Sequence, residues 1–159
     1  MKKYIISIDA GTTSNRSILF DLKGKPVYSS QKEFTQYFPK SGWVEHNPEE
    51  IWRTTLKTLK DVIQKAKRFR GKILSIGITN QRETTVLWDK KTGKPVYNAI
   101  VWQDRRQEEF CKKLRKQNKD TMIFNKTGLL IDSYFSGTKI KWILDNVSKA
   151  RQLMNKKQL

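Results

Sequence analysis

The chain has 159 residues, a mass of 18.8 kDa, one cysteine (Cys111) and a formal net charge of +18. This length fits one compact domain, and hydrophobic residues at 36% exclude wholesale disorder. A single cysteine excludes an intramolecular disulfide and a cysteine-based metal cage. The apolar runs are short and Asp9 comes too early for a signal peptide, so we expect a cytoplasmic protein without membrane insertion.

The positive charge is spread along the chain, mostly as lysine, instead of being gathered in one arm. Two interpretations remain open. A lysine-rich binding module could associate with nucleic acid or another anionic partner, whereas a solvated lysine-rich surface requires no partner. The even spread favours the solvated surface, with no specific nucleic-acid partner, and leaves the binding module as the alternative.

The first third of the chain predicts three strands joined by short turns. Apolar residues run over 4–8 and again over 17–21, and a turn at 22–26 leads into a third strand from Val27 to about Phe34. These strands form an antiparallel meander. A long loop, 35–47, follows.

A helix is predicted directly after Asn47. This residue can cap the helix, Pro48 suits its first position, and two glutamates follow at its positive end. The apolar residues recur every three or four positions: Trp52, Leu56, Leu59, Ile63 and Ala66. The next segment, 73–79, is continuously apolar, which is typical of a strand buried on both faces of a mixed sheet.

The second half predicts two strands over 84–88 and 96–102, then two helices. Asp104 is placed to cap the first helix, with Gln107 as its reciprocal partner, and the last helix begins at Ser136. The basic tail, 148–159, is expected to fray. We therefore expect one domain over 1–147 and a loose tail.

The order of the elements indicates an α/β fold. Three meander strands, a crossover helix and a parallel fourth strand describe the ribonuclease-H-like (actin-like ATPase) core shared by actin, Hsp70 and sugar kinases. The expected architecture is a mixed sheet with a three-strand antiparallel meander and flanking helices.

A hydroxyl-rich turn follows the first strand, where residues 9–16 read Asp-Ala-Gly-Thr-Thr-Ser-Asn-Arg. Gly11 lets the backbone approach a ligand closely, and Arg16 can neutralise phosphate charge. Asp9 is placed to hold Mg²⁺ through water. The hydroxyl and backbone N–H donors that could hold a phosphate are those of Thr12, Thr13 and Ser14. An ordinary polar hairpin turn with a solvated arginine explains the same residues.

Polar residues also follow the fourth predicted strand, at a strand end where open α/β sheets bind ligands. Arg82 offers donors beside the acceptors of Glu83, which suits a polyhydric alcohol; a surface ion pair is the alternative. Trp102 is either a flat wall against a substrate or a core aromatic, and Tyr134 offers a phenolic hydroxyl before a helix. His46 is interpreted as a packing or capping residue.

Five segments, taken in order, resemble glycerol kinases of the FGGY carbohydrate kinase family. The Asn-Gln-Arg-Glu-Thr run at 80–84 is specific to glycerol kinases within that family, and the resemblance covers about residues 3–150. It implies an enzyme that uses ATP and Mg²⁺ to convert glycerol into sn-glycerol 3-phosphate. The segments are 9–14, 42–46, 76–84, 99–103 and 134–139.

The resemblance also implies roles for individual residues. Those that contact the ATP phosphates are Thr12, Thr13, Ser14 and Arg16. Those that bind glycerol are Arg82, Glu83 and Tyr134 by hydrogen bonds and Trp102 by packing. The general base of this family is an aspartate that would lie beyond residue 159, as would the adenine-binding domain. We therefore expect no catalytic residue here, no activity of the 159 residues alone, and a separate C-terminal glycerol kinase chain as a candidate partner.

Three positions depart from the pattern of the family. Ala10 stands where Gln is usual and Asn15 where Ser is usual, so both are expected to loosen the phosphate turn. Ser133 stands where Pro is usual, which is expected to make the approach to Tyr134 less rigid.

Overall fold

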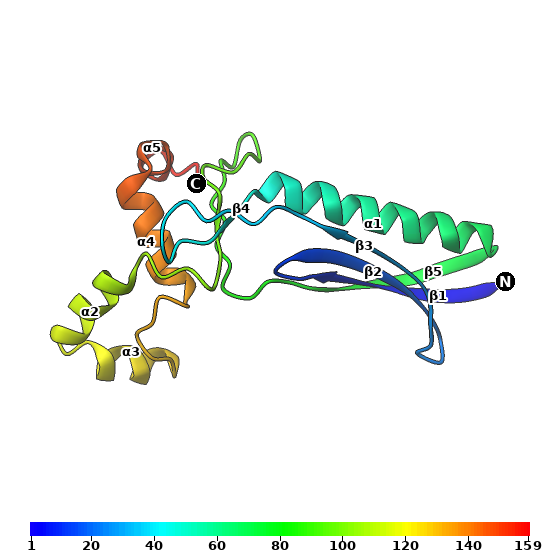
Figure 1. The fold of residues 1–159 in the computed structure, drawn as a ribbon, viewed down its shortest axis with the longest axis horizontal. Helices are drawn as coiled ribbons and strands as arrows, with labels where there is room; N and C mark the ends of the chain where they lie inside the picture. The colour runs from blue at the N-terminus through cyan, green and yellow to red at the C-terminus, as the bar shows by residue number, and fades with distance from the viewer. The chain divides into compact units, whose positions relative to one another are not determined.

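The computed structural model describes residues 1–159, and their contacts divide the chain into two compact units where the sequence led us to expect one domain over 1–147. Unit 1 consists of residues 1–36 and 49–81, and unit 2 of residues 37–48 and 82–159 (Figure 1). None of the helices combines the length and the apolar character that crossing a membrane requires.

Unit 1 is built on a four-stranded sheet with the order β3-β2-β1-β5. β1 pairs antiparallel with β2, β2 pairs antiparallel with β3, and β1 pairs parallel with β5. Helix α1 (Pro48–Arg68) lies along the sheet as the crossover (Figure 1). The strands are β1 (Lys2–Ala10), β2 (Ser14–Asp21), β3 (Pro26–Glu33) and β5 (Gly71–Thr79). The predicted meander, crossover helix and parallel strand are confirmed.

The core of unit 1 is apolar and follows the two-residue period of the strands. Tyr4, Ile6 and Ile8 of β1 are at most 5% exposed, and they pack with Leu19 of β2. Helix α1 contributes Val62 and Ala66, which recur four residues apart on one helix face.

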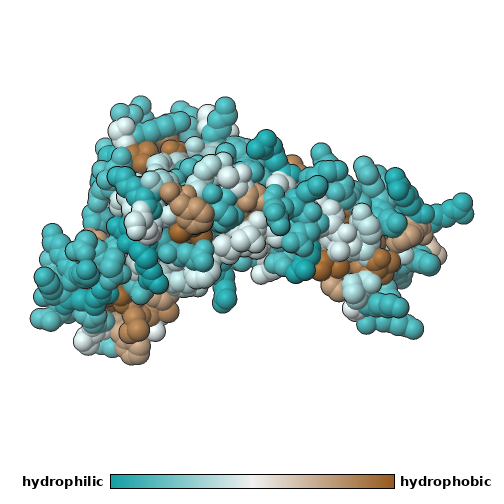
Figure 2. Space-filling view, viewed as in Figure 1, coloured by the Kyte–Doolittle hydropathy of each residue, from teal (hydrophilic) through white to brown (hydrophobic).

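The prediction that residues 73–79 are buried on both faces is wrong. Ile76 is 46% exposed and Ile78 is 74% exposed. β5 is the edge strand beyond β1, and its register with Ile6 and Ile8 sets these two side chains on the face of the sheet that helix α1 covers elsewhere. The face of the molecule in Figure 2 is mainly hydrophilic, with apolar patches between the hydrophilic areas.

Unit 2 contains little sheet and is mostly helices and loops. Its sheet is the pair β4 (Glu45–His46) and β6 (Ala99–Ile100). The predicted strands over 84–88 and 96–102 shrink to β6 and two isolated bridges, Thr85 to Ile100 and Trp88 to Pro95. Pro95 has no N–H to donate, so it cannot continue a ladder. The helices are α2 (Glu108–Lys116), α3 (Asp120–Thr127), α4 (Ser136–Asn146) and α5 (Ser148–Asn155).

A further expectation for unit 2 is wrong. Asp104 does not cap α2, which begins at Glu108 and has Gln107 at its N-cap without a side-chain hydrogen bond; instead, the Asp104 carboxylate accepts hydrogen bonds from Val44 and Arg106. The expected loose tail contains helix α5. Helix α5 buries Ala150 completely, and Leu159 packs against the same apolar cluster, because even a basic tail gains stability from burying a few apolar side chains.

Candidate functional site

The hydroxyl-rich turn of unit 1 is a tight connection between β1 and β2. The N–H of Gly11 donates to the carbonyl of Ser14 at 3.0 Å. A Cβ on Gly11 would lie 2.9 Å from that same oxygen, which no other residue could tolerate without a shift of the backbone. The Ser14 hydroxyl accepts a hydrogen bond from Gln31 at 2.9 Å, and the carbonyl of Thr12 accepts one from Gln36 at 3.1 Å. Side chains of β3 and of the residues just after it therefore hold the turn.

Asp9 and Arg16 are paired across the first two strands. Arg16 Nη2 lies 3.0 Å from Asp9 Oδ2, and the two side chains are 46% and 42% exposed. No cluster of three or more histidine, cysteine, aspartate or glutamate side chains could hold a metal ion.

Asn15 does not loosen the turn. Its side chain is fully buried, and Nδ2 donates to the carbonyl of Ile51 at 3.0 Å and to Thr54 Oγ1 at 2.7 Å. Both partners lie on α1, so Asn15 joins β2 to the helix beside the turn.

Glu83 lies at the start of α4 in unit 2. Its Oε2 accepts hydrogen bonds from the Ser136 N–H at 2.8 Å and the Ser136 hydroxyl at 2.7 Å. The hydrogen bond from the Ser136 hydroxyl lowers the pKa of Glu83, with a further contribution from the charge of Lys139. A carboxylate at a helix N-terminus is also favoured by the helix dipole. Glu83 has φ of 63°, a left-handed backbone that is uncommon outside glycine and is often found at functional sites.

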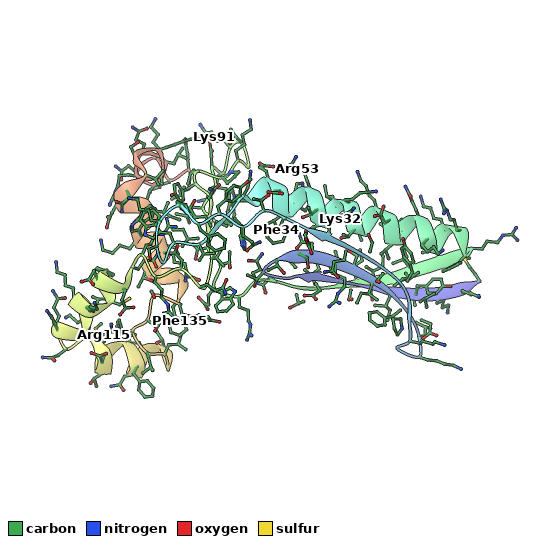
Figure 3. The ribbon with its side chains drawn as sticks, viewed as in Figure 1. Lys32, Phe34, Arg53, Lys91, Arg115 and Phe135 are labelled. Carbon is green, nitrogen blue, oxygen red and sulfur yellow. The ribbon has the colours of Figure 1, made fainter.

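The rings of Tyr134 and Trp102, the two aromatic residues expected to contact glycerol, lie close together. Their ring centroids are 6.0 Å apart in an edge-to-face arrangement. Phe135, the residue before α4 (Figure 3), packs perpendicular to Tyr134 at 5.2 Å. The backbone of Tyr134 is held as well, since its N–H donates to Asp132 Oδ1 at 2.7 Å.

Arg82 is exposed and does not form the predicted ion pair with Glu83, whose carboxylate is engaged by Ser136 instead. Ser133 is not a loose substitute for proline: it is fully buried, and its hydroxyl accepts a hydrogen bond from Arg105 at 3.1 Å. His46 is fully buried in β4, in agreement with its interpretation as a packing residue.

Sequence reasoning missed a buried cation, Arg106, whose side chain is 0% exposed. Its Nη2 lies 2.8 Å from both Glu45 Oε1 and Asp104 Oδ2. The guanidinium carbon is 3.8 Å from the centre of the Trp43 ring and 4.5 Å from that of Trp142. Burial alone would lower the pKa of Arg106, but its hydrogen bonds to Asp104 and Glu45 raise it. No short sequence signal reveals this cluster, because its members are up to 99 positions apart.

A second missed residue is Lys139, which is also fully buried. Its Nζ donates to the carbonyls of Ser133, at 2.9 Å, and Tyr134. In the sequence, Lys139 is the last residue of the segment 134–139. This segment resembles glycerol kinases, but the resemblance implied no role for Lys139. Its place on the inner face of α4, between apolar positions, was the available signal.

Comparison with known proteins finds similar sequences among glycerol kinases. The chain is 60% identical over 152 residues to glycerol kinases of Bacillus cereus (strain AH187) and Bacillus anthracis. That alignment covers 96% of this chain and 31% of the relatives' length, so the chain spans about a third of the proteins that it matches.

Solved structures agree with the sequence comparison. A glycerol kinase of Plasmodium falciparum, crystallised with ADP, superposes with a TM-score of 0.92 at 36% identity, over 99% of this chain and 31% of that one. A gluconate kinase of Lactobacillus acidophilus gives a TM-score of 0.86 at 25% identity, over 96% and 30%. These matches confirm the predicted actin-like α/β fold. Since residues 4–158 match the N-terminal domain of the FGGY carbohydrate kinases, the chain belongs to that family.

Proposed function

We propose that this chain supplies the phosphate-binding turn and part of the glycerol site of an ATP-dependent glycerol kinase, which converts ATP and glycerol into ADP and sn-glycerol 3-phosphate. The observation that carries the proposal is the 60% identity to glycerol kinases, combined with the grouping of Trp102 and Tyr134 in unit 2. Glu83 lies beside this pair through its hydrogen bonds to Ser136.

The turn of unit 1 is suited to the phosphates of ATP. Its donors are Thr12, Thr13 and Ser14, and Arg16 adds a positive charge at the neighbouring strand position. Mg²⁺, when bound with the nucleotide, would neutralise phosphate charge. Asp9 fits this ion through water, because half-exposed carboxylates accept hydrogen bonds from hydrated cations without displacing their ligands.

The side chains of unit 2 are suited to a polyol. Glu83 uses Oε2 for both hydrogen bonds to Ser136, so Oε1 is left to accept from a hydroxyl group. Arg82 offers donors, and the Tyr134 hydroxyl can both donate and accept. Trp102 provides an apolar surface against which carbon atoms can pack. Together these groups would orient glycerol.

Phosphoryl transfer also requires a base that accepts the glycerol proton, and we propose that this group comes from the C-terminal portion of a glycerol kinase. The exposed edge strand β5 supports such a partner. Ile76 and Ile78 present apolar surface beside an unpaired strand edge, a combination that favours the addition of another polypeptide.

The glycerol site can be tested by NMR titration of the 159-residue chain. We expect glycerol to shift the signals of Arg82, Glu83, Trp102 and Tyr134 with a dissociation constant in the millimolar range or weaker. Tyr134→Phe should weaken binding about 2- to 10-fold, the contribution of one hydrogen bond, while keeping the ring contacts. Tyr37→Phe, at an exposed tyrosine of the same unit, is the matched control. Shifts confined to surface lysines would refute the site.

Activity measurements can test whether catalysis requires the C-terminal portion of a glycerol kinase. The 159-residue chain alone should give no measurable glycerol 3-phosphate, because the loss of a positioned base costs about 10²- to 10⁴-fold in rate. Activity should appear when a separately produced C-terminal portion of a glycerol kinase is added. Turnover by the chain alone would overturn this proposal.

A further inference from the structure

The side chain of Lys139 contacts the backbone of the segment that carries Tyr134. Its side chain is fully buried in the first turn of α4, and Nζ donates to two successive backbone carbonyls, those of Ser133 and Tyr134. Nζ is also 5.9 Å from the centre of the Tyr134 ring. A buried lysine is costly unless its hydrogen bonds are satisfied, so a hydrophobic residue would serve packing alone more cheaply.

The same short segment is held from its other side by Glu83. The carboxylate binds the N–H and hydroxyl of Ser136, while the ammonium of Lys139 binds the carbonyls just before it. Two side chains of opposite charge thus fix residues 133–136. Tyr134 lies between these two attachments, against Trp102.

We propose that Lys139 is a positioning residue of the polyol site, which holds Tyr134 against Trp102 through the backbone carbonyls of 133–134 and thereby sets the affinity for glycerol. This inference rests on the function proposed above. Lys139 itself does not touch the substrate.

The charged and titratable groups around Lys139 come from several segments of unit 2. Burial lowers its pKa to about 8, against the opposing effect of the neighbouring carboxylates. The groups that favour the ammonium are Glu83, Asp104 and Asp132, and the one that disfavours it is Arg105. Burial raises the pKa of the Cys111 thiol on α2, and the charge of Lys139 lowers that pKa by less.

Two consequences of opposite direction follow for pH. Below about pH 8 the charged ammonium holds both carbonyls, and above it the neutral amine holds them less strongly, so glycerol affinity falls as pH rises. Folding stability responds the other way. Since the unfolded chain binds this proton more tightly, the burial of Lys139 destabilises the fold most at low pH, and that cost diminishes above about pH 8.

The test is an NMR titration of the 159-residue chain from pH 6.5 to 9, with and without glycerol. Without ligand, the amide signals of Tyr134 and Ser136 should follow one transition near pH 8. With ligand, affinity should fall about 5- to 10-fold across the same range, the difference between a charge-assisted and a neutral hydrogen bond.

Lys139→Met should abolish both transitions and weaken glycerol binding about tenfold at pH 7. Lys141→Met is the matched control, since this lysine of the same helix is exposed and paired with Asp145. If wild-type Tyr134 and Ser136 signals show no transition, the inference is overturned, even if Lys139→Met fails to fold. If the transition occurs but glycerol never binds, the proposed function fails and the positioning of Tyr134 by Lys139 stands.

Discussion

The two units of this chain are stabilised in different ways. Unit 1 places apolar side chains from two strands and one helix in a continuous core, and its buried polar pair, Ser17 and Thr58, is neutral. Unit 2 buries charged side chains instead: those of Glu45, Asp104, Arg106 and Lys139 are at most 3% exposed. Helices and strands pair their own backbone groups and can therefore have an apolar core. Loops leave backbone N–H and C=O groups unpaired, so buried polar and charged side chains must form hydrogen bonds with them.

This difference matters for the proposed function. The turn of unit 1 lies between two paired strands, and the side chains of Gln31 and Gln36 add hydrogen bonds to it. The polyol residues of unit 2 lie on loops and are positioned by individual side-chain contacts, such as Glu83 on Ser136 and Arg105 on Ser133. Substitutions of buried polar residues should therefore affect unit 2 more than comparable changes affect unit 1.

The largest expected effect is that of Arg106→Met. The substitution leaves the carboxylates of Glu45 and Asp104 buried without their cation, and losing one partner of a buried ion pair costs about 3–5 kcal/mol. Urea denaturation measures the loss. Arg105→Met is the control, since its pair with Asp132 is exposed and should contribute at most about 1 kcal/mol. Equal losses for the two variants would show that the buried cation does not stabilise unit 2.

Ile6→Ala tests the apolar core of unit 1. The side chain is 0% exposed, and removing it should cost about 2–5 kcal/mol through lost burial and the cavity left behind. Ile5→Ala, one position along the same strand, should cost less because that side chain is 38% exposed. Equal losses at the two positions would show that the buried apolar side chains of β1 do not stabilise unit 1.

The fold of unit 1 could be predicted from local patterns because its core follows them. The apolar residues of β1 recur every two positions and those of α1 every three or four, and both sets pack into one apolar core. The exception is β5, whose apolar residues indicated a fully buried strand although Ile76 and Ile78 are exposed. An apolar sequence indicates that a strand is suited to burial. It does not reveal which residues, if any, cover the faces of that strand.

The structure of unit 2 could not be predicted in the same way. Asp104 had the right residue type and spacing for a helix cap, yet Arg106 and Val44 compete successfully for its carboxylate. Glu83 was singled out as a candidate from its neighbours in the sequence, but its contact with Ser136 joins residues 53 positions apart. Motif resemblance identified the candidate substrate residues, whereas the side chains that hold them, Lys139 above all, became visible only in three dimensions.

The smallest expected effect is that of Ser133→Ala, at the position where the family usually has proline. The change removes the hydroxyl that accepts from Arg105 at 3.1 Å and lies 3.5 Å from a carboxylate oxygen of Glu108. Arg105 keeps its ion pair with Asp132, so no charge is left buried and unpaired. The backbone carbonyl that Lys139 binds is also unchanged. We therefore expect a loss of about 0.5–1.5 kcal/mol, the contribution of an ordinary hydrogen bond.

Thermal denaturation measures this loss, with Ser41→Ala at an exposed serine of the same unit as the control. A loss above about 3 kcal/mol would mean that the polar contacts of unit 2 act as one cooperative network, in which a single neutral hydroxyl contributes as much as a buried charge. A loss no larger than that of the control would mean that the backbone contacts of Lys139 and Asp132 alone hold the approach to Tyr134. In that case the hydroxyl would be dispensable, and the departure from proline would cost this loop nothing.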